Sequence, residues 1–562
     1  MKPRGRSGTA PRRRRAEPPT FDPVTLTVLW NRLVAIVDEA SATLVRTAFS
    51  RIVTDAGDFS CALFDAEGEM IVQPTQGLPS FIGCLATAVK HFLRAFPSPT
   101  LAPGDSLLTN DPWINTSQLN DMLLVTPVFH RGRIVGYAAN IAHSPDVGGR
   151  LLSADARELF EEGLRLPMVK LVSRGRLDPT IVDIIRANVR VPDIVIGDLL
   201  AQEAANTVMS RRLGELLLAA GLADLRALSR EILDRSEAAM RAAIKAMPDG
   251  VYGSLVETDG FDAPLVIRAT VTVRGDAMAV DFTGTSPQQE MGINCCFNYS
   301  YAETVFPLIA ISGPAAPVNA GTLRPLSVTA PDGTILSALH PAPLGGRLLV
   351  SMYVQCAIFR ALAAAVPDRV LADCAAPAWT PVVQGVNQYG RRFVDIVFLN
   401  GGLGARPMKD GVHTLGFPAP LGGTLVEVFE NEKPMFVERR ELAAETGGPG
   451  KYRGGAGLHF VVRSEAPGPI TVGLRADRLG HPALGAFGGE AGAPGTVRLN
   501  GHPQHPKRTI LLRAGDVLAF RTPGGGGYGD PRERDPEKVE VEVGAGLLSP
   551  ERAQSSYGRI AH

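Results

Sequence analysis

This sequence lacks several features that would assign it to a common class of protein. Its 562 residues carry no net charge, with 57 Lys and Arg against 57 Asp and Glu, so charge gives no indication of a nucleic-acid or membrane-surface partner. No apolar run is long enough to span a bilayer. The six cysteines include no C-x-x-C pair and several lie in apolar runs. This indicates buried free thiols in a reducing compartment, and we therefore expect a cytoplasmic protein.

Several common catalytic motifs are also missing. The chain holds no G-x-S-x-G nucleophile elbow, no H-E-x-x-H zinc motif and no recognisable nucleotide-binding loop. Residues 447–457 invite comparison with a phosphate-binding loop, but Glu445 stands where the first glycine belongs and Tyr452 where Ser or Thr belongs. Tight backbone turns explain these glycines better, as they do those of residues 522–531. If the reaction uses ATP, we expect another polypeptide to bind it.

What the sequence does contain is typical of a globular chain with several parts. The 60 glycines and 44 prolines favour a loop-rich chain that contains β-structure. Helical and strand periodicities alternate without βαβ regularity, so we predict an α+β fold with several layers of mixed helices and sheets. The predicted parts are a disordered basic tail (1–20), an N-terminal α+β domain with the candidate site (21–250), a central α+β region (251–420), and a β- and Gly-rich C-terminal region with a terminal helix (421–562).

Local patterns place the elements within these parts. Asp22 and Pro23 mark a helix start, and apolar residues follow at helical spacing up to Phe49. Residues 267–273 alternate between apolar and polar, which is typical of a half-buried strand. Further predicted helices are 82–96, 188–246 with a break near Gly221, 301–311, 348–365 and 531–543; predicted strands include 61–64, 70–72, 255–284, 425–437, 457–464, 470–474, 495–499, 509–512 and 517–520.

The most informative stretch is a predicted β-hairpin with polar ends. Strand-like runs at 122–129 and 133–142 are joined by a turn that contains Gly132. Because a hairpin folds back on itself, we expect Asp121 and His143, which are 22 positions apart, to become neighbours. A carboxylate beside an imidazole forms either part of a divalent-metal site or an acid/base pair.

Asp58, in the loop before the strand predicted at 61–64, adds a third candidate donor. Taken singly, Asp58 is typical of a turn, Asp121 of a strand end and His143 of a structural histidine. Together they supply two oxygens and a nitrogen, a donor set that suits Zn²⁺, Mn²⁺ or Fe²⁺. Asp146, three residues after His143, is a candidate to orient the imidazole. The candidate catalytic residues are therefore Asp121, His143 and Asp146.

A series of longer motifs runs along nearly the whole chain. They are 22–25 (Asp-Pro-Val-Thr), 58–61 (Asp-Phe-Ser-Cys), 110–113 (Asn-Asp-Pro-Trp), 142–143 (Ala-His), 146–149 (Asp-Val-Gly-Gly), 162–165 (Glu-Gly-Leu-Arg), 281–288, 317–321, 447–457 and 522–531. In this order they resemble the hydantoinase B/oxoprolinase family. That family includes the beta-type subunit of ATP-dependent N-methylhydantoinases, the C-terminal half of 5-oxoprolinases, and subunits of acetone and acetophenone carboxylases.

The resemblance implies a divalent metal, Zn²⁺ or Mn²⁺, on this chain. When the family's ligand positions are transferred to the matching motifs of this sequence, the ligands of the metal are Asp58, Gln118, Asp121 and His143. Gln118 stands where the family usually has histidine, and Phe81 stands where many relatives have histidine. A neutral glutamine amide is a poorer ligand for such a metal than imidazole. The predicted site is thus an altered version of the family's site.

The resemblance also implies the reaction and the partners. ATP on a hydantoinase A-type partner subunit would phosphorylate a cyclic amide, such as a hydantoin or a 5-oxoproline-like lactam, and metal-assisted attack of water on this subunit would open the C–N bond. We therefore expect a hydrolase within a hetero-oligomer, with no nucleic acid and no membrane as partner. Two alternatives stay open. One is a subunit of a carboxylase acting on a ketone, and the other is a scaffold with a degenerate site.

Overall fold

The computed structural model describes residues 21–419 and 421–558, and the predicted basic tail lies outside the described residues. Among the residues described, no helix has the length and hydrophobicity needed to cross a membrane. The helices are α1 (Pro23–Thr47), α2 (Arg51–Thr54), α3 (Pro79–Ala95), α4 (Leu159–Glu162), α5 (Pro179–Asn188), α6 (Pro192–Ala219), α7 (Arg226–Lys245), α8 (Phe297–Ser312), α9 (Ala320–Leu323), α10 (Leu348–Ser351), α11 (Val354–Leu362), α12 (Val426–Glu432), α13 (Pro536–Gly544) and α14 (Pro550–Tyr557).

The strands form four separate sheets among these helices, so the α+β prediction is confirmed. They are β1 (Phe59–Asp65), β2 (Met70–Val72), β3 (Ser106–Thr109), β4 (Asp121–His130), β5 (Arg133–His143), β6 (Val169–Ser173), β7 (Arg176–Leu177), β8 (Gly250–Thr258), β9 (Leu265–Arg274), β10 (Ala277–Asp281), β11 (Leu326–Thr329), β12 (Val382–Val386), β13 (Arg392–Ile396), β14 (Met435–Ala443), β15 (Gly457–Ser464), β16 (Ile470–Gly473), β17 (Thr496–Leu499), β18 (His502–Pro503), β19 (Thr509–Leu512) and β20 (Val517–Arg521).

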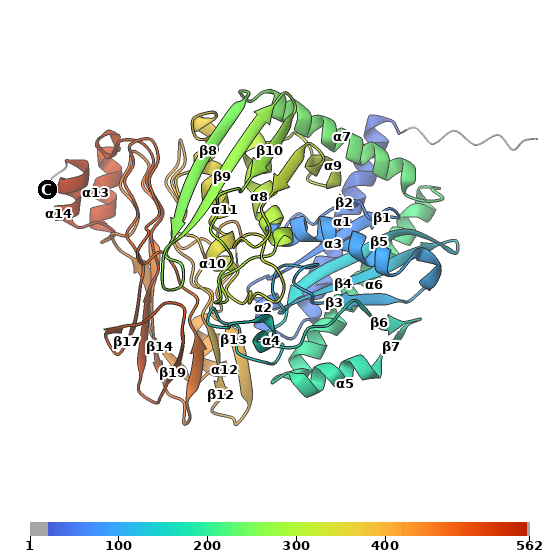
Figure 1. Ribbon diagram of the computed structural model, residues 1–562, viewed down its shortest axis with the longest axis horizontal. Coiled ribbons are helices and arrows are strands. Elements are labelled where there is room, and N and C mark those ends of the chain that lie inside the picture. Colours follow the sequence, from blue (N-terminus) through green and yellow to red (C-terminus); the bar gives the residue numbers. More distant parts are fainter. Residues whose placement is uncertain (1–20, 420, 559–562) are drawn as a thin grey trace, which may run out of the picture.

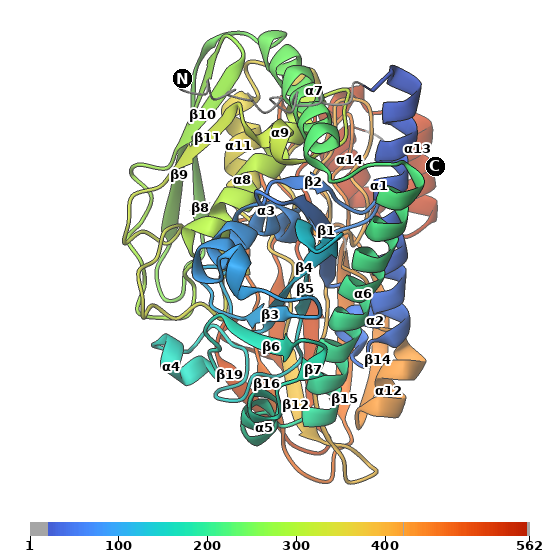
Figure 2. The same ribbon diagram turned by 90° about the vertical axis from the view of Figure 1, so that its right-hand side faces the viewer.

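The N-terminal sheet has seven antiparallel strands in the order β2-β1-β5-β4-β3-β6-β7. Its central strands are covered on both faces, because alternate residues of a strand point to opposite sides. Cys61 and Leu63 of β1 pack with α1 and α6, whereas Ala62 and Phe64 pack with α3 on the other side. Figure 2 shows α1 and α6 running side by side along this sheet. The hairpin predicted from the sequence is β4 and β5 at the middle of the sheet.

The long helix α1 begins where the sequence indicates. The side chain of Asp22 accepts hydrogen bonds from the backbone N–H groups of Val24 and Thr25, and Pro23 occupies the first helical position. Proline is tolerated there because its missing N–H would have no helical partner in any case. The predicted start of this helix is therefore confirmed.

The central sheet has the order β11-β10-β9-β8, and α8 and α11 pack beside it. On β9 the predicted alternation is confirmed, since Ile267, Ala269, Val271 and Val273 are buried and the polar residues between them are not. These residues share one hydrophobic core with side chains of the N-terminal sheet. The two regions therefore pack tightly against each other.

Two further sheets, β13-β12-β16-β19 and β14-β15-β20-β17-β18, face each other across a separate core around Trp379 (Figure 1, left). The strands β12 and β13 lie before residue 420 and pair with each other, and β12 also pairs with β16, which lies after it. This sheet therefore crosses one of the predicted domain boundaries, which stay predictions.

The strand predicted at 425–437 is wrong in its first half, which forms helix α12. Only Phe429 of this helix is buried, where it packs edge-on against Phe460 of β15. Because the whole of this helix buries a single side chain, its sequence shows no apolar periodicity that would distinguish it from a short strand.

The glycine-rich segments 401–404, 447–457 and 524–527 pack backbone against backbone, and we call them the glycine layer. Gly525 donates its N–H to the carbonyl of Gly455, and Gly448 donates its own to the carbonyl of Gly525. A Cβ atom on Gly454 would lie 1.9 Å from the carbonyl oxygen of Gly525. None of the glycines in 447–457 or 524–527 has a positive φ. Close approach of the backbones, rather than a left-handed conformation, therefore requires glycine in these two stretches, whereas Gly529 in the predicted turn segment 522–531 does have a positive φ of 74°.

Candidate functional site

The hairpin brings Asp121 and His143 together as the sequence predicts. The two residues are direct partners in the register of β4 and β5. His143 Nδ1 lies 2.8 Å from Asp121 Oδ1, and because a carboxylate only accepts, the ring nitrogen is the donor. The neighbouring strand β1 pairs with β5, which places Asp58 beside them: its carbonyl accepts the backbone N–H of His143, and its Oδ2 lies 3.8 Å from His143 Nδ1.

Gln118 reaches the same point from the loop before β4. Its amide Nε2 lies 3.1 Å from both carboxylate oxygens of Asp121 and 2.9 Å from His143 Nδ1. Thr116 also donates its hydroxyl to Asp121 Oδ2, and the amide of Asn115 donates to the carbonyl of Asp121. The loop thus directs donors at the carboxylate, and the four predicted site residues lie in one place.

Asp146 does not belong to this group. Its carboxylate accepts hydrogen bonds from the backbone and the guanidinium of Arg190 and from the N–H of Gly148. No hydrogen bond joins it to His143 among the residues described. The expectation that Asp146 orients His143 is therefore not met. Asp121, the cross-strand partner of His143, takes that place, because β5 ends at His143 and the chain beyond it carries Asp146 to Arg190.

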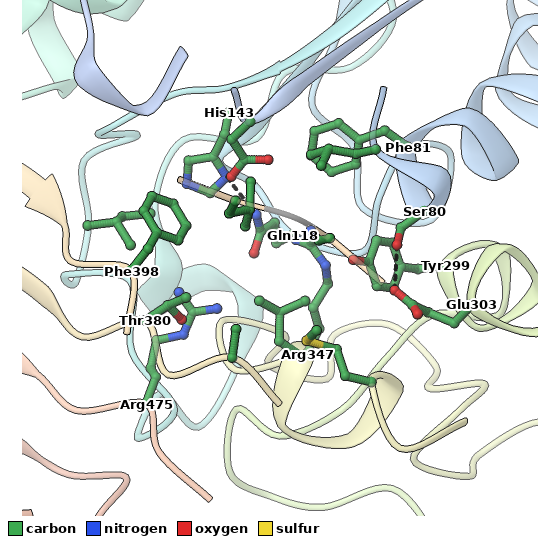
Figure 3. A pocket seen from close by; sticks show the side chains of 18 residues that line it. Ser80, Phe81, Gln118, His143, Tyr299, Glu303, Arg347, Thr380, Phe398 and Arg475 are labelled. Carbon is green, nitrogen blue, oxygen red and sulfur yellow. Dashed lines mark hydrogen bonds and ion pairs between the residues drawn. The ribbon is translucent and has the colours of Figure 1, made fainter. Parts of the chain in front are cut away.

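Two arginines that the sequence analysis did not single out complete the site. Arg347, just before α10, lies with Nη1 3.1 Å from Asp121 Oδ2, and its guanidinium covers the ring of Tyr299 with 4.3 Å between guanidinium carbon and ring centre. Arg475 follows β16 and faces the same space. Figure 3 shows both guanidinium groups directed toward Gln118 and His143. Nothing local in the sequence distinguishes either arginine from a surface residue.

These residues line a small cavity of about 30 Å³. Apolar side chains close part of it, among them Phe81 and Phe398. On the side of α3 and α8, the hydroxyl of Ser80 donates to Glu303 across 2.6 Å. Asp58, His143 and the two arginines come from three distant parts of the chain. The site therefore exists only where the N-terminal, central and C-terminal sheets meet.

Burial and charge set the acidities in this cavity. Burial raises the pKa of Asp58 to about 6, although the neighbouring His143 opposes the shift. Burial also acts to raise the pKa of Asp121, but the charges of Arg347 and then His143 outweigh it and bring that pKa to about 2. For Arg475, burial and the like charge of Arg347 lower the pKa to about 9. Asp121 is thus held as a carboxylate, while Asp58 can exchange a proton near neutral pH.

The donor set does not fit a divalent metal ion. Both oxygens of Asp121 already face N–H or O–H donors, and one of these is the permanently charged Arg347. A cation placed here would also meet the charge of Arg475, and two like charges repel strongly in a buried site. Within residues 21–419 and 421–558, no three His, Cys, Asp or Glu side chains are arranged to hold a metal. The metal prediction thus has no support from the geometry.

Comparison with known proteins shows sequence similarity to one protein family over nearly the whole chain. The sequence profile of hydantoinase B/oxoprolinase matches residues 22–531. The chain is 33% identical to an uncharacterized protein of Methanocaldococcus jannaschii over 96% of both chains, and 32% identical to caprolactamase subunit beta of Pseudomonas jessenii over 96% of both.

Solved structures agree with the sequence comparison. The crystal structure of the ATP-dependent caprolactamase from Pseudomonas jessenii superposes with a TM-score of 0.89 over 97% of both chains at 29% identity. The nucleotide-free structure of an acetone carboxylase superposes with a TM-score of 0.83 over 96% of this chain and 79% of the other, at 19% identity, which shows a shared fold. The chain belongs to the hydantoinase B/oxoprolinase family.

Proposed function

We propose that this chain is a subunit of an ATP-dependent hydrolase that opens cyclic amides. The observation that carries the proposal is the similarity, over nearly the full length of both chains, to the beta subunit of an ATP-dependent caprolactamase. In this reaction a partner subunit transfers the terminal phosphoryl group of ATP to the amide oxygen of the ring and releases ADP. On this subunit, water then adds to the activated carbon and gives up a proton. The C–N bond breaks as the nitrogen accepts a proton, and inorganic phosphate leaves as the carboxylic acid forms.

The partner is a hydantoinase A-type subunit that binds ATP, so the active enzyme is a hetero-oligomer. The relative's name, "subunit beta", supports an assembly with at least one other chain. The packing of the glycine layer also supports this division of labour. Its glycines contact one another's backbones, which leaves Lys451 without a phosphate cradle; its amino group pairs instead with Glu533 at 3.0 Å.

The side chains in the cavity have separate roles in this proposal. His143 Nε2 has no hydrogen-bond partner among the described residues, and Nδ1–H donates to Asp121. This arrangement suits a histidine that takes a proton from the attacking water while Asp121 fixes its orientation. Asp58, with a pKa of about 6, is suited to deliver a proton to the departing nitrogen. Asp146 has no catalytic role here, and no step requires a metal.

Co-expression with the matching partner tests the proposal. The pair is expected to convert caprolactam into its ring-opened amino acid, or hydantoin into the N-carbamoyl amino acid, only when ATP is present. His143→Gln is expected to lower that rate by about 100-fold or more. His502→Gln, an exposed histidine far from the cavity, is the matched control and is expected to keep full activity. An active pair whose rate does not change with His143→Gln would reject the assigned role. No ATP-dependent ring opening of any cyclic amide would reject the function.

Two specific observations favour other functions. The shared fold with an acetone carboxylase favours a carboxylase subunit that acts on a ketone; in that case ATP turnover would depend on bicarbonate. The donors of Gln118 and Arg347 at the predicted metal position favour a scaffold. A scaffold would bind the partner tightly, and His143→Gln would leave the partner's ATP turnover unchanged.

A further inference from the structure

Arg475 is a buried charge without a counter-charge in contact. Its exposed fraction is 2%, and it lines the cavity described above. Within the described part of the chain, its side chain makes no hydrogen bond and has no carboxylate within 4.0 Å; its Nε is buried and unpaired. Burying an unpaired guanidinium is costly, and buried charges in proteins are normally paired. A side chain of this kind is explained if a ligand supplies the partner.

Arg347 presents a second guanidinium to the same space. It is also 2% exposed, and its Nε has no hydrogen-bond partner among residues 21–419 and 421–558. Its one carboxylate partner there is Asp121, at 3.1 Å from Nη1. The guanidinium carbon of Arg347 also lies 4.3 Å from the centre of the Tyr299 ring, a cation–π contact that helps to hold the side chain in place. Arg347 precedes helix α10 and Arg475 follows strand β16, yet both side chains point into one cavity (Figure 3).

The cavity is small, about 30 Å³, so the group that it takes is compact. A planar guanidinium also matches a carboxylate in geometry, with two parallel N–H···O bonds. The apolar side chains of Phe398 and Leu421 on the cavity wall would receive the carbon atoms next to such a group.

We propose that Arg347 and Arg475 form a binding site for a carboxylate group. As far as the source of the carboxylate is concerned, the inference rests on the proposed function. Opening a cyclic amide by hydrolysis produces a carboxylic acid, so the pair would hold the carboxylate of the product. A carboxylate substituent on the ring of the substrate is the second source of the same chemistry.

Titration of the full chain alone, without partner or ATP, tests the site. Isothermal calorimetry at constant ionic strength is expected to show saturable binding of acetate and no binding of acetamide, its neutral counterpart. Arg475→Gln is expected to weaken acetate binding about tenfold or more, because it removes charged hydrogen bonds. Arg475→Lys keeps the charge but loses the paired N–H groups. Its affinity for acetate is expected to lie between those of the wild type and Arg475→Gln. Arg513→Gln, an exposed arginine outside the cavity, is the matched control.

Three results would overturn the site. The first is no acetate binding to the folded wild-type chain, and the second is binding of acetate by the folded Arg475→Gln and Arg475→Lys variants as tightly as by the wild type. The third is tighter binding of phosphate than of acetate. The source is tested with δ-valerolactam, its ring-opened amino acid, and the lactam carrying a carboxylate beside the nitrogen. Binding of the amino acid supports the product, and binding of the substituted lactam supports a substrate carboxylate. Acetate binding in a chain that fails the co-expression assay would reject the proposed function while keeping the site.

Discussion

The pairing of Arg347 with Asp121 makes a strong prediction about stability. In Arg347→Met the carboxylate of Asp121 stays buried without its cation. The ion pair and His143 bring the pKa of Asp121 from 3.8 to about 2, a difference of about two units, which corresponds to about 3 kcal/mol. Losing one partner of a buried pair costs about 3–5 kcal/mol in general. We therefore expect Arg347→Met to lower the free energy of unfolding by about 3 kcal/mol at neutral pH.

The dependence on pH follows from the lowered pKa. A carboxyl group whose pKa is lower in the folded state adds stability above its unfolded pKa of about 4, and this stability is lost as the pH falls through about 2. The deficit of Arg347→Met is therefore expected to shrink as the pH is lowered over that window, because protonated Asp121 no longer needs its cation. Urea unfolding, followed by fluorescence and circular dichroism with coincident transitions, provides the measurement.

A double-mutant cycle identifies the pair as the cause. Asp121→Asn alone leaves Arg347 buried without its carboxylate and is also expected to destabilise the chain. In the Arg347→Met background the same substitution is expected to cost little, so that the coupling energy is about 2–3 kcal/mol. Strictly additive losses, or a deficit that is the same at every pH, would refute the reasoning.

Three further predictions concern single positions. Burial raises the pKa of Asp58 to about 6, and a carboxyl group with a raised pKa loses stability as the pH rises through that value. In urea unfolding, wild type is therefore expected to lose about 3 kcal/mol more stability than Asp58→Asn between pH 4 and pH 7. Equal losses in the two proteins would contradict the raised pKa. Purified wild type and His143→Ala are expected to contain equally negligible zinc and manganese by mass spectrometry, and a stoichiometric metal that only wild type retains would restore the metal site. Gly454→Ala, whose Cβ would lie 1.9 Å from a carbonyl oxygen, is expected to destabilise the chain by more than about 3 kcal/mol in thermal unfolding, whereas Gly468→Ala, with nothing within 4 Å, should be near neutral.

The part of the site that lies on the hairpin was predictable from the sequence. A turn between two apolar runs fixes which residues face each other, and Asp121 and His143 lie at the matching ends. Asp58 was also found, since it precedes a recognisable strand. The pattern predicts Asp121 as a neighbour of His143, but the expectation that Asp146 orients the imidazole is wrong. A residue three positions away looks close in the sequence, but the cross-strand neighbour is closer in space.

The two arginines were beyond prediction because their role depends on tertiary packing. Arg347 and Arg475 reach the cavity from segments that are distant along the chain from the hairpin and from each other. Sequence periodicity does not indicate which distant segments come into contact, and an isolated arginine is expected at the surface. The same holds for the bond between Ser80 and Glu303, which joins α3 to α8.

The start of helix α5 carries a capping signal in the sequence. Asp178 and Pro179 start helix α5 in the same way as Asp22 and Pro23 start α1, with the carboxylate accepting from the next N–H groups. The apolar spacing instead predicts that the helical region begins at residue 188, which is the last residue of α5. Patterns of capping residues thus carried more information than the apolar spacing, because α5 buries only Ile185.

The glycine layer has a consequence for how the chain reaches its native state. Its segments exchange backbone hydrogen bonds with one another, as Gly448, Gly455 and Gly525 do, so no segment can satisfy its N–H and C=O groups until the others arrive. Since these partners are far apart in the sequence, their meeting is entropically demanding and slow. We expect the layer to assemble late and as one unit. In a ribosome-bound chain from which residues 524–527 have not yet emerged, the N–H and C=O groups of the earlier segments would stay in water, so the layer would form only after residue 527 has emerged.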